Sequence, residues 1–174
     1  MKITHPTEKE YQQSSYQSRY IDLVSHENVL EALQKNAVLV AETFAKIPAE
    51  KELFRYAEGK WTIREMLGHI IDTERIMMYR ALCIARGEKQ VLPGFEENEY
   101  VLEANFNKRS LKSMLQEYKL QRKLNLIMVK NLSQKSLKNM GKVNNLPLSA
   151  RAILWIVAGH ELHHLNILRE KYLI

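Results

Sequence analysis

The chain has 174 residues, of which 45% are hydrophobic and 26% are charged, enough for one domain over residues 1–174 with a hydrophobic core. The net charge is +6, but acidic residues lie among the basic ones and the most basic stretch, residues 130–142, has no aromatic residue, which argues against nucleic-acid binding. No apolar run reaches the roughly 18–20 residues of a membrane span, and the single cysteine, Cys83, cannot form an internal disulfide. We therefore expect a cytoplasmic protein that binds neither nucleic acid nor membranes, with Cys83 as a small buried residue.

The N-terminal part of the chain predicts a polar leader followed by a helix. Residues 1–25 are polar with several aromatics, and we expect an extended leader that packs on the surface of the domain. Apolar residues then recur at helical spacing and Pro48 follows them, which predicts a helix over residues 27–46.

A second helix has a sharp start signal. Thr62 and Glu65 have the spacing of a capping box, in which the two side chains bind free backbone N–H groups of the first turn. Apolar residues continue as far as Gly87, and glycine commonly follows the last turn of a helix. The sequence Pro-Gly-Phe at residues 93–95 predicts a turn, and a short helix is predicted over residues 96–105.

A third long helix is expected after Ser110, which is a good N-terminal cap. Its apolar positions lie between residues 111 and 132, and they include Leu124 and Ile127. We expect these side chains to face the interior, as the apolar face of a surface helix usually does.

The last helix completes an all-helical pattern. Residues 141–147 are expected to form a loop, and Ser149 to cap a helix that runs nearly to the end of the chain. No alternating pattern typical of a strand is apparent. Four long helices with apolar faces predict an all-α fold, a four-helix bundle, and the connection of about 20 residues between the second and third is long enough to cross it.

The densest group of potential metal ligands is His-Glu-Leu-His-His at residues 160–164. A helix turns about 100° per residue, so His160 and His164 lie on one face and can hold the same transition metal. His160 with His163 is an alternative pair, less favoured because its angular separation is larger. A third ligand is needed, and His69, in the middle of the second helix, is the best candidate. We therefore predict a metal held by His69, His160 and His164, with at least one coordination position open.

The same segment also fits the His-Glu-x-x-His pattern of zinc proteases, in which the glutamate, here Glu161, acts as general base. Such proteases normally find a third ligand downstream, where Glu170 is the one acidic residue, and no strand is predicted to bind a peptide. A protease is therefore disfavoured. Asp72, three residues after His69, could orient that ring or a bound water, and it could equally be a surface charge paired with an arginine.

Four stretches resemble the DinB/YfiT-like superfamily of small metal-binding helical proteins: residues 16–24 (YQSRYIDLV), 59–75 (GKWTIREMLGHIIDTER), 92–95 (LPGF) and 158–164 (AGHELHH). The likeness covers nearly the whole chain, and Trp61 with the helix start and His69 is its most specific part, together with the histidine segment. The resemblance implies an antiparallel four-helix bundle with long crossover connections, often a homodimer. It also implies a divalent metal, zinc or nickel, on three histidines that match His69, His160 and His164.

That superfamily includes transferases acting with low-molecular-weight thiols such as bacillithiol, mycothiol or glutathione, and a thiol-dependent isomerase. The resemblance therefore implies a metal-dependent transferase in which a metal-activated thiol attacks a small electrophile. Arg75, Arg80 and Arg86 are candidates for recruiting an anionic thiol, although each is equally compatible with a surface charge. Two alternatives stay open: metal-dependent hydrolysis of a small molecule with Glu161 or Asp72 as base, and a non-catalytic bundle that binds metal for stability or sensing.

Overall fold

Side-chain caps mark the starts of the long helices in the computed structural model, which describes residues 1–13 and 15–173. The Thr62 hydroxyl accepts a hydrogen bond from the Glu65 N–H (3.0 Å) and the Glu65 carboxylate accepts one from the Thr62 N–H (2.7 Å), so the predicted capping box is confirmed. Ser110 and Ser149 also cap helices, and each cap satisfies an N–H that the first turn leaves free. The four long helices are α2 (Val29–Ala45), α3 (Ile63–Ala85), α5 (Leu111–Lys130) and α7 (Ala150–Ile167).

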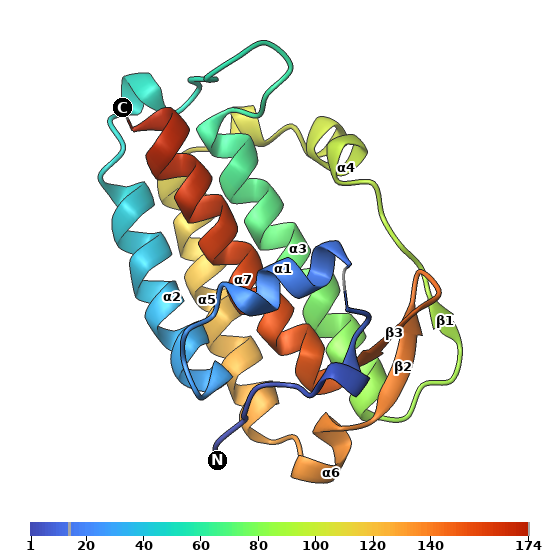
Figure 1. Cartoon of the computed structure of the whole chain (residues 1–174). Coiled ribbons are helices and arrows are strands. Elements are labelled where there is room, and N and C mark those ends of the chain that lie inside the picture. Colours follow the sequence, from blue (N-terminus) through green and yellow to red (C-terminus); the bar gives the residue numbers. More distant parts are fainter. Residues whose placement is uncertain (14, 174) are drawn as a thin grey trace.

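These helices form a bundle in which two run in each direction (Figure 1). Helix α2 packs against α5 and α7, and α3 packs against the same two helices, so α2 and α3 lie at opposite corners. Because α3 and α5 run in the same direction, the chain between them returns along the outside of the bundle. The predicted four-helix bundle with a long crossover is therefore confirmed. The shorter elements are β1 (Val91–Leu92), α4 (Glu97–Ala104) and η3 (Phe106–Lys108) in this crossover, η2 (Ala49–Lys51) between α2 and α3, α6 (Gln134–Leu137) after α5, and η4 (Leu168–Tyr172), which continues α7.

A small sheet lies beside α3, where the sequence predicted only a loop. Strands β2 (Met140–Val143) and β3 (Leu146–Ser149) form an antiparallel hairpin, and β1 joins β2 in parallel. Asn144 and Asn145 form the hairpin turn with positive φ values of 48° and 64°, as a two-residue type I′ turn requires. The expected loop over residues 141–147 is thus wrong, because strands of four residues are too short to show a clear alternation.

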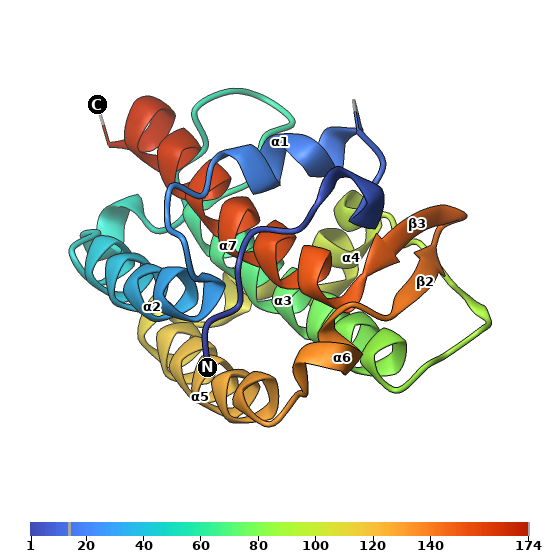
Figure 2. The ribbon, with the colours of Figure 1, turned by 60° about the horizontal axis from the view of Figure 1, so that its bottom comes forward.

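The N-terminal residues pack on the bundle, but they are not fully extended as expected. They contain η1 (Glu8–Glu10) and α1 (Tyr16–Asp22), and α1 crosses the outer face of α7 (Figure 2). The crossing is close because Gly159 has no side chain: a Cβ atom there would lie 1.7 Å from the Tyr20 carbonyl oxygen. Ile21 is fully buried, so this segment contributes to the core as well as covering it.

The core consists of two apolar clusters, one toward each end of the bundle, with polar side chains between them. Helix α7 is buried at each position from 150 to 161, because α1, α2 and α3 all pack on it. Leu124 and Ile127, by contrast, are 67% and 53% exposed, so their predicted place on an inner face of α5 is wrong. Cys83 is partly buried against the first cluster. Within the described residues, no helix has the length and apolar character needed to span a membrane.

Candidate metal centre

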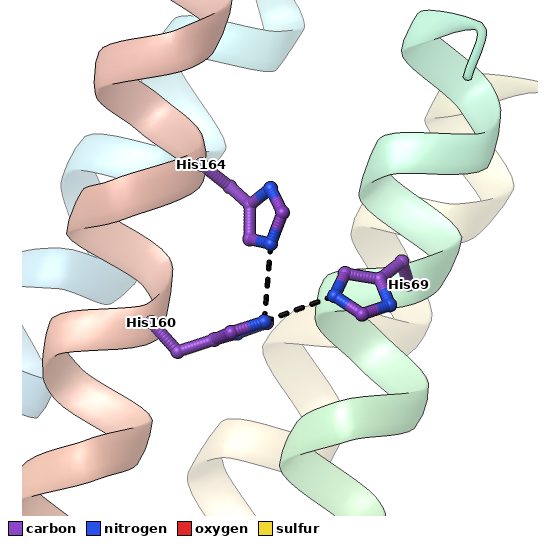
Figure 3. Close-up of side chains that lie close together, drawn as sticks. All are labelled: His69, His160 and His164. Atoms are coloured by element: carbon purple, nitrogen blue, oxygen red, sulfur yellow. Dashed lines mark hydrogen bonds between the residues drawn. The ribbon is translucent and has the colours of Figure 1, made fainter. Parts of the chain in front are cut away.

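Three histidines converge where α3 packs against α7 (Figure 3). His69 lies two turns into α3, and His160 and His164 lie one turn apart on the facing side of α7. The Nε2 atom of His160 is 2.9 Å from the Nε2 atom of His69 and 3.1 Å from that of His164. All three side chains are buried. The structure thus brings together the three residues predicted to hold a metal.

Hydrogen bonding alone accounts poorly for this arrangement. A ring nitrogen offers either one N–H donor or one lone pair, so the Nε2 atom of His160 can make one good bond, yet two nitrogens approach it. In a tetrahedral zinc site with Zn–N distances of about 2.0–2.1 Å, ligand nitrogens lie roughly 3.3 Å apart, close to the two separations measured from His160, and all three ligand atoms lie within 4.8 Å of one another. Within the described part of the chain, these three side chains are the group placed closely enough to share an ion. Imidazole ligands suit several divalent transition metals, zinc, nickel and copper among them.

Burial keeps these imidazoles in the neutral form that a metal ligand needs. Loss of solvation, with a smaller contribution from the nearby His163, lowers the pKa of His69 to about 4. Burial likewise lowers the pKa values of His160 and His164 well below the ordinary value, with added repulsion from neighbouring histidines. The protonated forms are therefore disfavoured at neutral pH, and the lone pairs stay available.

His163, the alternative ligand, lies outside this cluster. Its ring packs edge-on against the rings of His164 and Tyr20, with centroid separations of 5.1 and 5.5 Å. Partial burial lowers its pKa. His160 and His164 are therefore the pair that faces His69. This agrees with the sequence prediction, because the angle between these two positions on a helix is smaller than that between His160 and His163.

The Glu161 carboxylate lies in the polar layer of the core. The Tyr118 hydroxyl donates a hydrogen bond to it (2.7 Å), the guanidinium of Arg122 pairs with it, and the Asn36 amide lies 3.4 Å away. Arg122 also pairs with Glu74 at 2.8 and 3.0 Å, so the layer joins all four long helices. Burial raises the pKa of the Glu161 carboxyl, against the attraction of Arg122. These contacts favour a structural role for Glu161 over the predicted role of general base.

Of the two roles predicted for Asp72, the structure agrees with a surface charge paired with an arginine. Its carboxylate pairs with Arg75 (3.2 Å), and Arg75 also pairs with Glu117 of α5 (2.7 Å). The polar atom beside the Nδ1 atom of His69 is the Thr73 hydroxyl, at 3.5 Å. Thr73, which sequence reasoning missed, is thus better placed than Asp72 to orient the His69 ring, and the Arg75 charge is already paired.

The other two arginines lie far from the histidines. Arg80 is eleven residues beyond His69 on α3, about 16 Å along the axis, and Arg86 lies at the end of this helix. Arg80 donates a hydrogen bond to the Pro93 carbonyl oxygen (2.6 Å) and lies over the Phe95 ring, so it holds the turn at this point. This geometry does not support the expected role of Arg80 in recruiting a thiol.

A cavity of about 220 Å³ adjoins His164 at the end of the bundle where α3 begins and α7 ends. Tyr56 and Trp61, which precede α3, form part of its wall together with Tyr172 of η4. Larger hollows of about 680 and 670 Å³ lie along α5, but no histidine of the cluster lines them. Sequence reasoning missed Tyr56 and Tyr172, because only the tertiary course of the α2–α3 connection brings them together. Trp61, which directly precedes the capping box, was the one lining residue named above that the sequence analysis had singled out.

Comparisons with known proteins agree with this fold. YfiT from Bacillus subtilis, described as a probable metal-dependent hydrolase with an unusual four-helix bundle topology, matches with a TM-score of 0.76 and 14% identity over 94% of this chain and 95% of that one. A mycothiol-dependent maleylpyruvate isomerase matches with a TM-score of 0.66 and 12% identity over 84% of this chain and 61% of that one. No curated protein matches significantly by sequence. A family model described as the DinB superfamily matches residues 32–168, a range that contains all three histidines, and the chain therefore belongs to the DinB superfamily.

Proposed function

We propose that this protein is an enzyme that depends on a divalent metal, zinc or nickel, held by His69, His160 and His164. The observation that carries the proposal is the convergence of three buried, neutral imidazole nitrogens, one of them from a histidine, His164, that also lines a cavity. Three protein ligands, rather than four, are typical of catalytic zinc sites. The description of YfiT, which shares the fold, as a probable metal-dependent hydrolase supports the same view.

The chain's own residues prepare this site in several ways. When bound, the metal would lower the pKa of a thiol or of water, so that a nucleophile forms near neutral pH. The Trp61 ring packs on the His69 ring with centroids 4.5 Å apart and shields it from solvent. The Thr73 hydroxyl lies beside the other ring nitrogen of His69 and helps to fix the orientation of the ring. The contacts of Glu161 in the polar layer hold α7, and with it the other two ligands.

The reaction that we propose is thiol transfer. The sulfur of a low-molecular-weight thiol forms a bond to an electrophilic carbon of a small molecule, while a leaving group departs with its electron pair and the thiol proton passes to solvent. The fold shared with a mycothiol-dependent isomerase supports a role for a thiol. The small cavity beside His164 supports a small electrophile.

Hydrolysis is the second candidate, because YfiT is described as a probable metal-dependent hydrolase. In this reaction water takes the place of the thiol. A general base is harder to assign, since Glu161 is engaged by Arg122 and Tyr118, and Asp72 is paired with Arg75. The two reactions differ in whether product forms without added thiol, so one assay separates them.

Elemental analysis by mass spectrometry on untagged protein tests the metal. The wild type should carry about one zinc or nickel ion per chain, His160→Ala should lose it, and the matched control His163→Ala should keep it, because His163 lies outside the cluster. A wild-type protein that takes up no metal on reconstitution would refute the proposal.

A screen of thiols against electrophiles then tests the reaction, with the metal-loaded wild type and His69→Ala side by side. Conjugation that needs both thiol and His69 supports thiol transfer. Product formed without thiol indicates a hydrolase. No turnover, combined with a steep fall in melting temperature when metal is removed, indicates a non-catalytic bundle in which the metal is structural.

A further inference from the structure

Helix α5 carries a row of apolar side chains on its outward face. The helix packs against α2 and α3, while α1 and the small sheet lie on other sides of the bundle (Figure 2). Leu120, Leu124 and Ile127 are 62%, 67% and 53% exposed. Single exposed leucines are common, but these three follow one another at helical spacing and therefore form one continuous apolar row.

A hollow of about 680 Å³ lies beside this row, between α3 and α5. Both helices contribute apolar side chains to its lining: Met78, Tyr79, Leu82, Leu120, Leu124 and Met128. Along α5 the lining extends from Ser113 to Met128, which is about 22 Å or four helical turns. Methionine side chains adapt their shape to what packs on them. An elongated apolar hollow between two helices is suited to a third helix laid along it.

A row of four lysines flanks the apolar row on the side of α2. They are the exposed residues Lys112, Lys119, Lys123 and Lys130. Because a helix turns about 100° per residue, this spacing places them on one line, about 90° around the axis from the apolar row. Lys112 and Lys119 line the second hollow, between α2 and α5.

The charges of these lysines are not neutralised within the described part of the chain. None of the four forms an ion pair there. The one acidic residue of α5, Glu117, is paired with Arg75 and Arg109 instead. The outer face of α5 therefore combines exposed apolar side chains with a positive flank.

Charge decides what kind of helix suits this face. A partner helix in the hollow would place its apolar side on Leu120 and Leu124 and one flank beside the lysines, as the e and g positions of a coiled coil do. Acidic side chains on that flank are attracted, and basic ones are repelled. A second copy of this chain fits poorly, because an antiparallel two-fold pair of α5 helices brings both lysine rows to the same side of the seam. A lipid surface would neutralise the lysines but leave the hollow unfilled.

We propose that the face formed by α3 and α5 binds an amphipathic helix of a partner protein, about four turns long, with an apolar stripe and an acidic flank. The apolar row and the hollow supply the contact area, and the lysine row selects the charge of the partner. The lining of the hollow contains none of the three histidines, so this inference does not depend on the proposed function.

Fluorescence anisotropy with designed peptides tests the charge preference on the full chain. The probe is a labelled peptide of about four helical turns, with leucine every three or four residues and glutamate on the flanks. The control peptide has lysine in place of each glutamate. The acidic peptide should bind at micromolar concentration, at least about tenfold more tightly than the basic one, and raising the salt should weaken it severalfold. Equal affinities, or no binding of the acidic peptide, would overturn the proposal.

A substitution in the apolar row locates the binding. Leu124→Glu should weaken the acidic peptide about tenfold or more, because it removes an apolar contact and places a like charge in the row. Leu102→Glu is the matched control, since Leu102 is 74% exposed on α4 and lies outside the hollow. Equal effects of the two substitutions would contradict the assigned face.

Charge reversal tests the lysine row. The double variant Lys119→Glu with Lys123→Glu should bind the acidic peptide about tenfold more weakly. The double variant Lys138→Glu with Lys142→Glu makes the same charge change at exposed positions outside both hollows, and it should bind nearly as the wild type does. If both double variants lose affinity equally, net charge and not this row attracts the peptide, and the proposal fails.

Two other occupants give distinct results. A wild-type dimer in analytical ultracentrifugation that Leu124→Glu converts to monomers would make this face an interface between copies of the chain. Binding to phosphatidylserine vesicles without binding to the acidic peptide would make it a membrane-binding surface. Either result would overturn the proposal of an acidic partner helix.

Discussion

The polar layer of the core predicts a large loss of stability when Arg122 is replaced by leucine. Arg122 is 2% exposed and pairs with both Glu74 and Glu161, so the substitution leaves two carboxylates buried without their cation. Breaking a buried ion pair on one side costs about 3–5 kcal/mol. For a domain of this size each kcal/mol lowers the melting temperature by about 2–4 °C, so Arg122→Leu should melt about 6–20 °C below the wild type.

Urea and thermal unfolding of the metal-free protein, followed by circular dichroism, would measure this effect. The matched control is Arg75→Leu, which removes a half-exposed arginine paired with Glu117 and should cost less than about 1 kcal/mol. A loss below about 1 kcal/mol for Arg122→Leu would refute the reasoning.

A compensating variant separates charge from packing. If the penalty comes from unpaired carboxylates, then replacing Glu74 and Glu161 by leucine together with Arg122→Leu should restore most of the stability, because a well-packed apolar set can replace a buried ionic cluster. A triple variant as unstable as the single one would show that packing around Arg122, and not the charges, carries the effect.

Three further predictions concern other parts of the molecule. Gly159→Ala should destabilise the protein by about 1–3 kcal/mol in urea, because its Cβ would displace the backbone at Tyr20, and unchanged stability would contradict the close crossing. The free energy of unfolding of the metal-free protein should fall by about 3 kcal/mol between pH 6.5 and 4 through His69 alone. The reason is that His69 takes up a proton near pH 6.5 in the unfolded state but only near pH 4 in the folded state. The variant His69→Phe should flatten this part of the stability profile. If the expected homodimer uses the exposed apolar face of α5, Leu124→Lys should yield monomers in analytical ultracentrifugation, whereas a monomeric wild type would refute the dimer.

The helices were predictable because their signals are local. Thr62, Ser110 and Ser149 each stand where a helix begins, and a cap acts within one turn of the chain. The small sheet was missed because its strands are short and its turn, Asn144-Asn145, is a less common form of the Asn-Gly signal. Apolar spacing alone could not decide which face of α5 is buried, since that depends on which helices pack beside it.

In the candidate site, too, the features with a local sequence signal were predictable and those that depend on tertiary packing were not. His160 and His164 share a helix, so their spacing was enough to pair them, and elimination together with the family resemblance pointed to His69. The surroundings of Glu161 depend on Arg122 and Tyr118 of another helix, and no local pattern shows that α5 turns those two side chains toward α7. The sequence therefore predicted the ligands better than the groups around them.

The enclosure of α7 has a consequence for how an ion would enter the centre. A helix buried over residues 150–161 exchanges its amide hydrogens only when much of the molecule opens, so His160 should stand on the slowest-exchanging part of the fold, with His164 one turn beyond it. Residues 53–60, just before Trp61, are all exposed. Entry and exit of an ion should therefore proceed through local opening of the segment before α3, with the pair on α7 already in place to receive it.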